Sequence, residues 1–383
     1  MTGIRAAVSA LFFLNGMVVG GWAPLVPELA ARHGLSESAM GLVILAFGMG
    51  SIVIMPLSGA LIARFGARPL LRITCLVTAP GLLPIVLAPN VAALAVIMVC
   101  FGGMLGSMDI AMNANAVVVE RRMARAIMSS CHGFWSLGGL IGATFGGVLI
   151  EYAGTLIQAL VISAAALAMA VCSLARIAAD LPAEKGDKPG FRLTLKPLPY
   201  VLGLAALCSM VPEGAVLDWG ALYLRQDFGA DAATSGLAFG AVAATMAVMR
   251  FAGDAVRQRF GAVATVRLST VIAAAGLLAA AAAPTPAIVI AGFALSGFGL
   301  ANLVPITLSA AGNAPGLPPG VGISIATSMG YAGILMGPAL IGLVAEHNSF
   351  SFAFYGLSAL FAIVLLLSAF MRHADIGGDV ETR

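Results

Sequence analysis

A carboxylate and an amide four residues apart lie within the stretch FGGMLGSMDIAMNANAVVVERRMAR, at residues 101–125, which begins apolar and ends in a basic cluster. The acid is Asp109, and Asn113 follows four residues later, which places both side chains on one helix face. An ionised carboxylate is costly inside a bilayer and usually faces a protein interior or a water-filled path. We therefore predict that Asp109 binds and releases a proton, and that Asn113 bonds a solute hydroxyl group. A structural hydrogen bond to a neighbouring helix is the alternative for each.

A second acid, Glu213, lies in the apolar segment Val211-Pro-Glu-Gly214. Because proline removes a backbone donor and glycine loosens the turn, we predict that the helix breaks here and lines a cavity. Glu213 is then a further proton-coupling or solute-binding residue.

Other polar and aromatic residues extend this set of predicted solute contacts. Asn15 and Asn302 are amides within apolar segments, and Trp219 offers a ring face for a sugar or cyclitol, unless it only anchors the membrane interface. His132 could relay protons, with Trp135 one turn further on, although a single histidine is more often structural.

The composition places these residues in a membrane protein. Hydrophobic residues make up 60% and charged residues 10% of the chain, at a mean hydropathy of +1.02, whereas soluble domains carry about a quarter charged residues. We predict an all-α membrane protein, because twelve apolar stretches are long enough to cross a bilayer. Their expected ranges are 6–29, 39–62, 70–88, 91–118, 127–150, 155–176, 199–224, 233–253, 263–283, 286–310, 320–345 and 351–371.

The basic residues define the orientation. With the N-terminus in the cytoplasm, every Lys and Arg lies on the cytoplasmic side except Arg32, Arg225 and Arg250. This asymmetry predicts an N-in, C-in topology in a bacterial inner membrane.

The two parts of the chain resemble each other. A shift of 195 residues superimposes Arg64-Phe65-Gly66 on Arg259-Phe260-Gly261 and aligns eight glycines of the first part with glycines of the second. We therefore predict two pseudo-symmetric six-helix halves with a site between them. The expected divisions are an N-terminal half at 1–177, a cytoplasmic linker at 178–198, a C-terminal half at 199–372 and a cytoplasmic tail at 373–383.

Small residues recur at a spacing of four, at Gly138, Gly142 and Gly146 and again at Gly333 and Gly337. This spacing lets helix backbones approach closely. We predict that these helices move against partners in the opposite half.

The segment Gly59-Ala-Leu-Ile-Ala-Arg-Phe-Gly-Ala-Arg68 resembles the motif G-x-L-x-D-R-x-G-R-[RK] of the major facilitator superfamily, with Ala63 in place of the usual Asp. The resemblance implies a fold in which helices 1, 4, 7 and 10 line a central cavity. It also implies a cytoplasmic gate, although basic residues at cytoplasmic helix ends need no gate to explain them. The predicted gate residues are Arg64, Arg68, Arg250, Asp254 and Arg259, with Arg250 and Asp254 able to pair along one helix face.

Other segments resemble the MosC-like branch of that superfamily, whose bacterial members are linked to transport of rhizopine and other inositol- or sugar-like solutes. They are Asp109-Ile-Ala-Met-Asn113 with Glu120-Arg121-Arg122, Ser129-Ser-Cys-His-Gly-Phe-Trp-Ser136, Glu213-Gly-Ala-Val-Leu-Asp-Trp219, and Gly330-Tyr-Ala-Gly333 with Gly337-Pro338. Tyr331, within the last of these, joins the predicted solute contacts.

We expect a monomeric secondary transporter that moves a small polar solute (a sugar, a cyclitol or a related metabolite) by proton-coupled alternating access. The alternatives are a drug or metabolite efflux proton antiporter of the same fold and a sensor that binds solute without moving it. The five cysteines occur singly, and no Walker loop, zinc signature or nucleophile elbow is present. We therefore expect no cofactor, metal or nucleic-acid partner and no enzymatic activity.

Overall fold

The computed structural model describes residues 2–123, 127–179, 195–315 and 321–375. These residues form α-helices joined by short turns, with a 3₁₀-helix at the end. In chain order they are α1 (Thr2–Trp22), α2 (Leu25–His33), α3 (Glu37–Phe65), α4 (Ala67–Thr78), α5 (Leu82–Val86), α6 (Val91–Met123), α7 (Met128–Leu174), α8 (Leu198–Phe228), α9 (Ala232–Phe260), α10 (Ala262–Ala281), α11 (Pro286–Gly312), α12 (Val321–His347), α13 (Phe350–Leu367) and η1 (Ser368–Ala374).

Eleven segments of the described chain are long and apolar enough to cross a membrane, and one of them contains two crossings. Helix α7 has 47 residues, which at 1.5 Å per residue is about 70 Å and more than twice the thickness of a bilayer core. Gly154 interrupts it with φ 82° and ψ 168°, a conformation that residues with a Cβ rarely adopt. The chain therefore reverses at Gly154, and the twelve predicted spans are confirmed.

Proline affects three of these spans in different ways. Pro24 separates α1 from α2, and Pro80 lies between α4 and α5, so each of these two spans is made of two helices. Helix α8 instead runs unbroken through Pro212, so the predicted break beside Glu213 is wrong. Pro212 is buried among the surrounding helices. A proline inside a membrane helix is tolerated where neighbouring helices pack around it.

The internal repeat extends to the backbone and to the helix caps. Gly66 has φ 84° and ψ 166°, and Gly261, 195 residues later, has φ 77° and ψ 163°. Ser36 and Asp231 are related by the same shift, and each caps the helix that follows it with its side chain. The two halves therefore begin and end equivalent helices in the same way.

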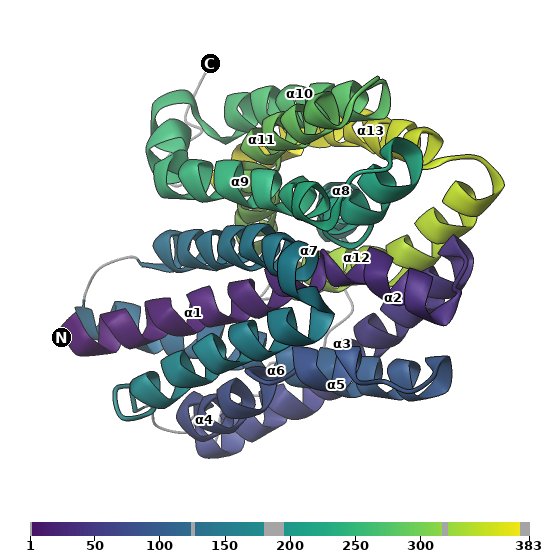
Figure 1. Ribbon diagram of the computed structural model, residues 1–383. Coiled ribbons are helices and arrows are strands. Elements are labelled where there is room, and N and C mark those ends of the chain that lie inside the picture. The colour runs from purple at the N-terminus through teal and green to yellow at the C-terminus, as the bar shows by residue number, and fades with distance from the viewer. Residues whose placement is uncertain (1, 124–126, 180–194, 316–320, 376–383) are drawn as a thin grey trace.

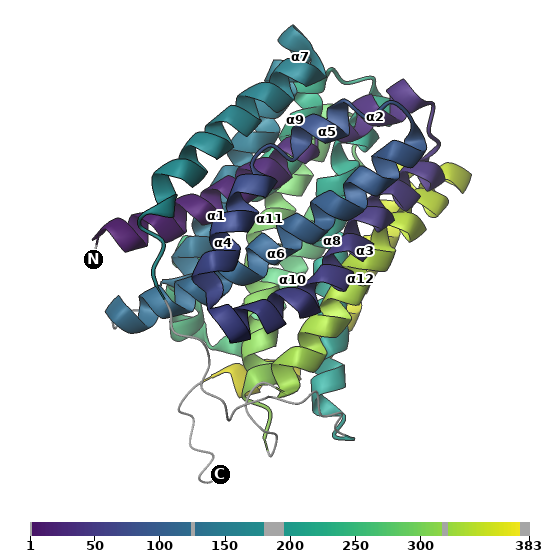
Figure 2. The same cartoon turned by 90° about the horizontal axis from the view of Figure 1, so that it is seen from below.

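The halves pack as two groups of helices (Figure 1), with α8 to α11 and α13 above α1 to α6. They meet where α7 packs against α9 and where α3 packs against α12. Figure 2 shows α6, α3 and α12 side by side across the second of these contacts. Most of the predicted linker and tail, at 180–194 and 376–383, lies outside the described residues.

The glycine ladders pack within the halves, which differs from the prediction. A Cβ on Gly138 or Gly142 would collide with the backbone of α1 in the same half, and one on Gly333 would meet Leu207 and Val211 of α8. The faces turned toward the opposite half use other glycines. Gly147 of α7 approaches α9, and Gly41 of α3 approaches Pro338 of α12.

Candidate functional site

Arg250 of α9 joins the two halves inside the bundle. Its Nη2 donates to Oε1 of Glu213 on α8 at 3.3 Å, and its Nη1 donates to the Ser136 hydroxyl on α7 at 2.6 Å. Glu213 belongs to the same half as Arg250, whereas Ser136 belongs to the other half. The guanidinium group is therefore a polar link across the interface between the halves.

Three residues predicted from the sequence lie around this link. The Arg250 guanidinium carbon lies 5.7 Å from the centre of the Trp135 ring, a cation–π arrangement. The indole Nε1 of Trp135 donates to Asn15 Oδ1 on α1 at 2.8 Å. His132 lies one turn before Ser136 on α7 and packs edge-on against Phe12, with 5.2 Å between ring centres. The structure thus brings Asn15, Trp135 and Glu213 together.

The Arg250–Glu213 pair is accessible to solvent although it lies inside the bundle. The exposed fractions of the two side chains are 13% for Arg250 and 22% for Glu213. Gly214 follows Glu213 on α8, and beyond its own turn of the helix no atom lies within 4 Å of the position that a Cβ would occupy there. The surface of α8 is therefore open at the residue next to Glu213.

Asp109 forms a second polar centre on α6. The Asn113 amide donates to the backbone oxygen of Asp109 at 2.9 Å and to its Oδ1 at 3.3 Å, as their spacing predicts. The side chain of Tyr331, on α12 of the opposite half, also hydrogen-bonds to the Asp109 carboxyl group. Tyr331 also brings this second centre near the first one. Its neighbour Gly330 packs against Met210 of α8, one turn from Glu213.

Two other predicted solute contacts lie elsewhere. Trp219 is completely buried, with its ring 5.8 Å from that of Phe350 on α13. Asn302 of α11 lines a cavity of about 440 Å³ between α9, α10 and α11, together with Ser269. Neither residue belongs to the two polar centres, because each faces helices of its own half.

The predicted gate residues are spread over the cytoplasmic helix ends. Arg64 and Arg259 are exposed, and each stacks on the phenylalanine that follows it, at 5.0 and 5.5 Å. Arg68 is partly buried at the start of α4. The side chain of Asp254 lies outside the described residues, and Arg250 pairs with Glu213.

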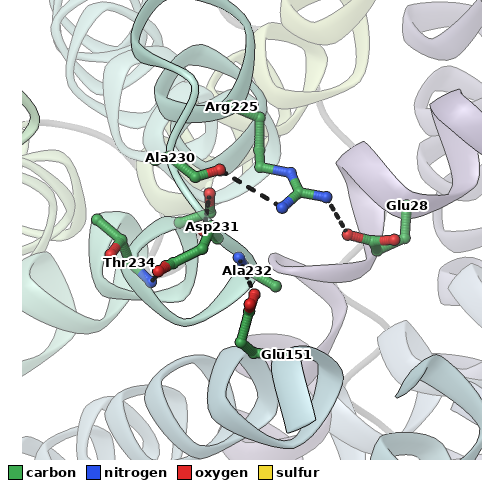
Figure 3. Close-up of polar contacts among 8 residues, drawn as sticks. Glu28, Glu151, Arg225, Ala230, Asp231, Ala232 and Thr234 are labelled. Atoms are coloured by element: carbon green, nitrogen blue, oxygen red, sulfur yellow. Dashed lines mark hydrogen bonds and ion pairs between the residues drawn. The ribbon is translucent and has the colours of Figure 1, made fainter. Parts of the chain in front are cut away.

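A group of contacts that the sequence analysis did not predict joins the outer ends of the two halves. Arg225 donates to Glu28 at 2.6 Å, and the Ala232 amide donates to Glu151 at 2.8 Å (Figure 3). Deeper in the bundle, Trp22 Nε1 donates to Asp218 at 3.3 Å. The Ser38 amide donates to Glu346 at 2.9 Å in the same way. The opposite charges of Glu28 and Arg225 at outer helix ends were the only sequence signal for this closure.

Within the described residues, no group of three or more His, Cys, Asp or Glu side chains could hold a metal ion. The two centres instead supply a guanidinium, carboxyl groups, amides and a phenol. Such groups can bind a polar solute and exchange protons with it or with water.

Comparison with known proteins agrees with this arrangement. A Major Facilitator Superfamily profile matches residues 8–212 and 202–380. An uncharacterized MFS-type transporter of Yersinia pestis is 35% identical over 96% of both chains. The membrane protein MosC of Rhizobium meliloti is 31% identical over 96% of this chain and 90% of its own.

Solved structures share the fold at low sequence identity. The nucleoside transporter NupG has a TM-score of 0.69 at 14% identity, over 98% of this chain and all of its own. The fucose:proton symporter FucP of E. coli has a TM-score of 0.63 at 16% identity, over 96% and 98% of the two chains.

The fold and the matches identify a membrane transporter: this chain belongs to the Major Facilitator Superfamily. Within it, the similarity to MosC over nearly the whole chain places the protein in the MosC-like branch. The protein is thus a multi-pass transporter of small-molecule solutes in a bacterial inner membrane, and it is not an enzyme.

Proposed function

We propose that this protein moves a small polar solute (a sugar, a cyclitol or a related metabolite) by proton-coupled alternating access, as a monomer. The observation that carries the proposal is the link from Arg250 to both Glu213 and Ser136, because it joins ionisable groups to both halves. A change in the charge of Glu213 would alter how Arg250 is held. It would thereby alter the contact of Arg250 with Ser136, on which the relative position of the halves depends.

Asp109 and Glu213 are the proposed proton-coupling residues. Each lies inside the bundle and bonds a polar side chain from another helix, Tyr331 or Arg250. Asn15, Asn113, His132, Trp135 and Tyr331 are the proposed solute contacts. Arg64, Arg68 and Arg259 are proposed for the cytoplasmic gate. The superfamily fold accommodates a proton symporter in FucP and a nucleoside transporter in NupG, so the solute class depends on the site.

The test is transport by the purified protein in proteoliposomes. We expect Asp109→Asn to abolish accumulation of solute driven by a proton gradient while counterflow of solute continues, because exchange needs no net proton movement. Asp231→Asn makes the same chemical change at an exposed helix cap, so it should leave both activities unchanged. Wild-type accumulation by Asp109→Asn would remove this residue from the coupling mechanism.

The same preparation separates the alternatives. Solute uptake into inverted vesicles, driven by a proton gradient directed out of the vesicles, would identify an exporter. A protein that binds solute but supports no flux in either direction would be a sensor, and the transport proposal would then be wrong.

A further inference from the structure

Arg250 is a cation inside a membrane-spanning segment, Ala232–Gly253. Arg32 and Arg225 lie at outer helix ends, and the remaining Lys and Arg residues lie on the cytoplasmic side. A cation at such depth is costly and usually marks the path of a substrate or ion. Arg250 is not needed for topology, so its contacts must explain its presence.

Arg250 has two partners besides its acid. Ser136 accepts from Nη1 at 2.6 Å, and the Trp135 ring lies 5.7 Å from the guanidinium carbon. The contact with Glu213 is longer, at 3.3 Å, and uses the single oxygen Oε1. A well-paired Arg–carboxylate contact is bidentate and shorter. Glu213 is therefore the most readily exchanged partner of Arg250.

The guanidinium group also has unused donors. Of its five N–H groups, the described residues engage one at Ser136 and one at Glu213. Both members of the pair remain partly exposed, and the space beside Gly214 is open. A solute that enters beside α8 and displaces Glu213 would meet free N–H donors for two oxygens.

The charges around Arg250 favour one particular ligand. Among the described side chains, the titratable groups that face it are Glu213 from α8 and His132 from α7. Among the described residues of α10 and α11, which also pack against α9, no acid pairs with it. When Glu213 takes up a proton, Arg250 becomes an uncompensated cation, which costs several kcal/mol inside a protein. A carboxylate from the solute would restore the pairing with better geometry.

The rest of the cluster suits a hydroxylated solute. Trp135 stands beside the guanidinium group and donates to Asn15, whose amide nitrogen has no partner among the described residues and can bond a hydroxyl group. A single exchangeable cation can neutralise one negative charge and no more. We infer that the transported solute is a hydroxylated monocarboxylate, such as an aldonate or a uronate, whose carboxylate replaces Glu213 on Arg250. This inference rests on the proposed transport function and specifies its substrate class.

Binding to the purified full-length protein tests the inference. The panel is gluconate and galacturonate, with glucose and myo-inositol as neutral counterparts and glucarate as the dianion. We expect the two monocarboxylates, and neither the neutral compounds nor the dianion, to raise the thermal unfolding temperature of the protein. Calorimetry in two buffers of different ionisation enthalpy should show uptake of about one proton for each monocarboxylate bound.

Variants locate the effect. Arg250→Gln should weaken monocarboxylate binding by about 10- to 100-fold, as expected for loss of a charged hydrogen-bond partner. Arg176→Gln, the same change at an exposed position, should bind like the wild type. Glu213→Gln should bind monocarboxylates without proton uptake. Because Arg250→Gln leaves an acid unpaired, the double variant Glu213→Gln/Arg250→Gln serves as a folded control that should show the same weakened binding of monocarboxylates.

Three outcomes would overturn the inference: equal stabilisation by the neutral compounds, undiminished binding by the double variant, or no stabilisation of the wild type by either monocarboxylate. None of them affects the proposed transport function, which is tested by flux. Conversely, monocarboxylate binding without any flux would support this site and contradict transport.

Discussion

The environment of a single side chain decides what Arg250 can do. An arginine that projected to the cytoplasmic surface would serve topology alone, whereas Arg250 turns inward and contacts Trp135, Ser136 and Glu213. A planar guanidinium group can use one edge for fixed partners and another edge for a ligand. The same side chain can therefore join the halves and bind solute.

At the outer surface, the helix-capping residue Asp231 allows the effect of pH on a single hydrogen-bonded carboxyl group to be measured. Asp231 accepts from the Thr234 amide at 2.7 Å, and this bonding holds the pKa of its carboxyl group below the usual value. A lowered pKa means that the stabilisation is present above the unfolded-state pKa, near 4, and is lost as the pH falls through the folded-state value. We expect Asp231→Ala to cost about 1 kcal/mol at neutral pH and progressively less below about pH 4.

Ser349 provides the comparison, because it caps α13 with a hydroxyl that does not titrate. Ser349→Ala should cost a similar free energy at every pH. Thermal unfolding of both variants between about pH 3 and pH 7 gives the measurement. Identical pH profiles for the two variants would contradict this account of the Asp231 cap.

At the scale of helices, contacts at the outer ends determine which side of the protein is closed. Helices α1 and α2 are tied to α8 by Trp22–Asp218 and Glu28–Arg225, and the end of α12 is tied to α3 by Glu346. All of these contacts join one half to the other. They must break if the outer side is to open, as alternating access requires.

The Glu28–Arg225 pair is partly exposed, with side-chain exposures of 25% and 30%, so it contributes about 1 kcal/mol or less. We expect Arg225→Gln to raise the population of the outward-open state by up to about fivefold, since 1 kcal/mol is about a factor of five. Spin labels at the exposed outer positions Tyr152 and Gln226 would measure this by pulsed electron resonance.

The reversed pair, Glu28→Arg with Arg225→Glu, should restore the wild-type distance distribution because it rebuilds the attraction. A distribution unchanged by Arg225→Gln would mean that the other outer contacts alone hold this end closed.

At the scale of the whole molecule, the halves contact each other through closely packed helices with small residues. On α9, a Cβ added at Gly236 would lie 2.5 Å from the carbonyl oxygen of Ala143 and 3.0 Å from the Cα of Gly147, both on α7. These contacts are with backbone atoms, which cannot move aside alone. Any added volume must therefore displace one half from the other.

We accordingly expect Gly236→Val to destabilise the protein by about 1–3 kcal/mol, the usual cost of overpacking, and to reduce flux. Gly356→Val is the matched control, because α13 leaves open space at that glycine. Thermal unfolding in detergent and flux in proteoliposomes are the measurements. Normal stability and flux for Gly236→Val would show that this interface is not tightly packed during transport.

Much of the architecture followed from the sequence, for physical reasons that act locally. Apolar length defined the spans, basic residues defined the orientation, and the 195-residue repeat appeared again in Gly66 and Gly261 and in the caps Ser36 and Asp231. The spacing of Asp109 and Asn113 likewise determined their mutual bond. Each of these features depends on residues close together in the chain or on the bilayer itself.

The tertiary structure alone decided which residues meet across helices. It paired Arg250 with Glu213 and Ser136, brought Tyr331 to Asp109, buried Trp219 against Phe350, and kept α8 continuous through Pro212. Composition and periodicity specify the face of a helix on which a residue lies, but the partner of that face depends on how all the helices pack. The site between the halves is therefore a property of their packing.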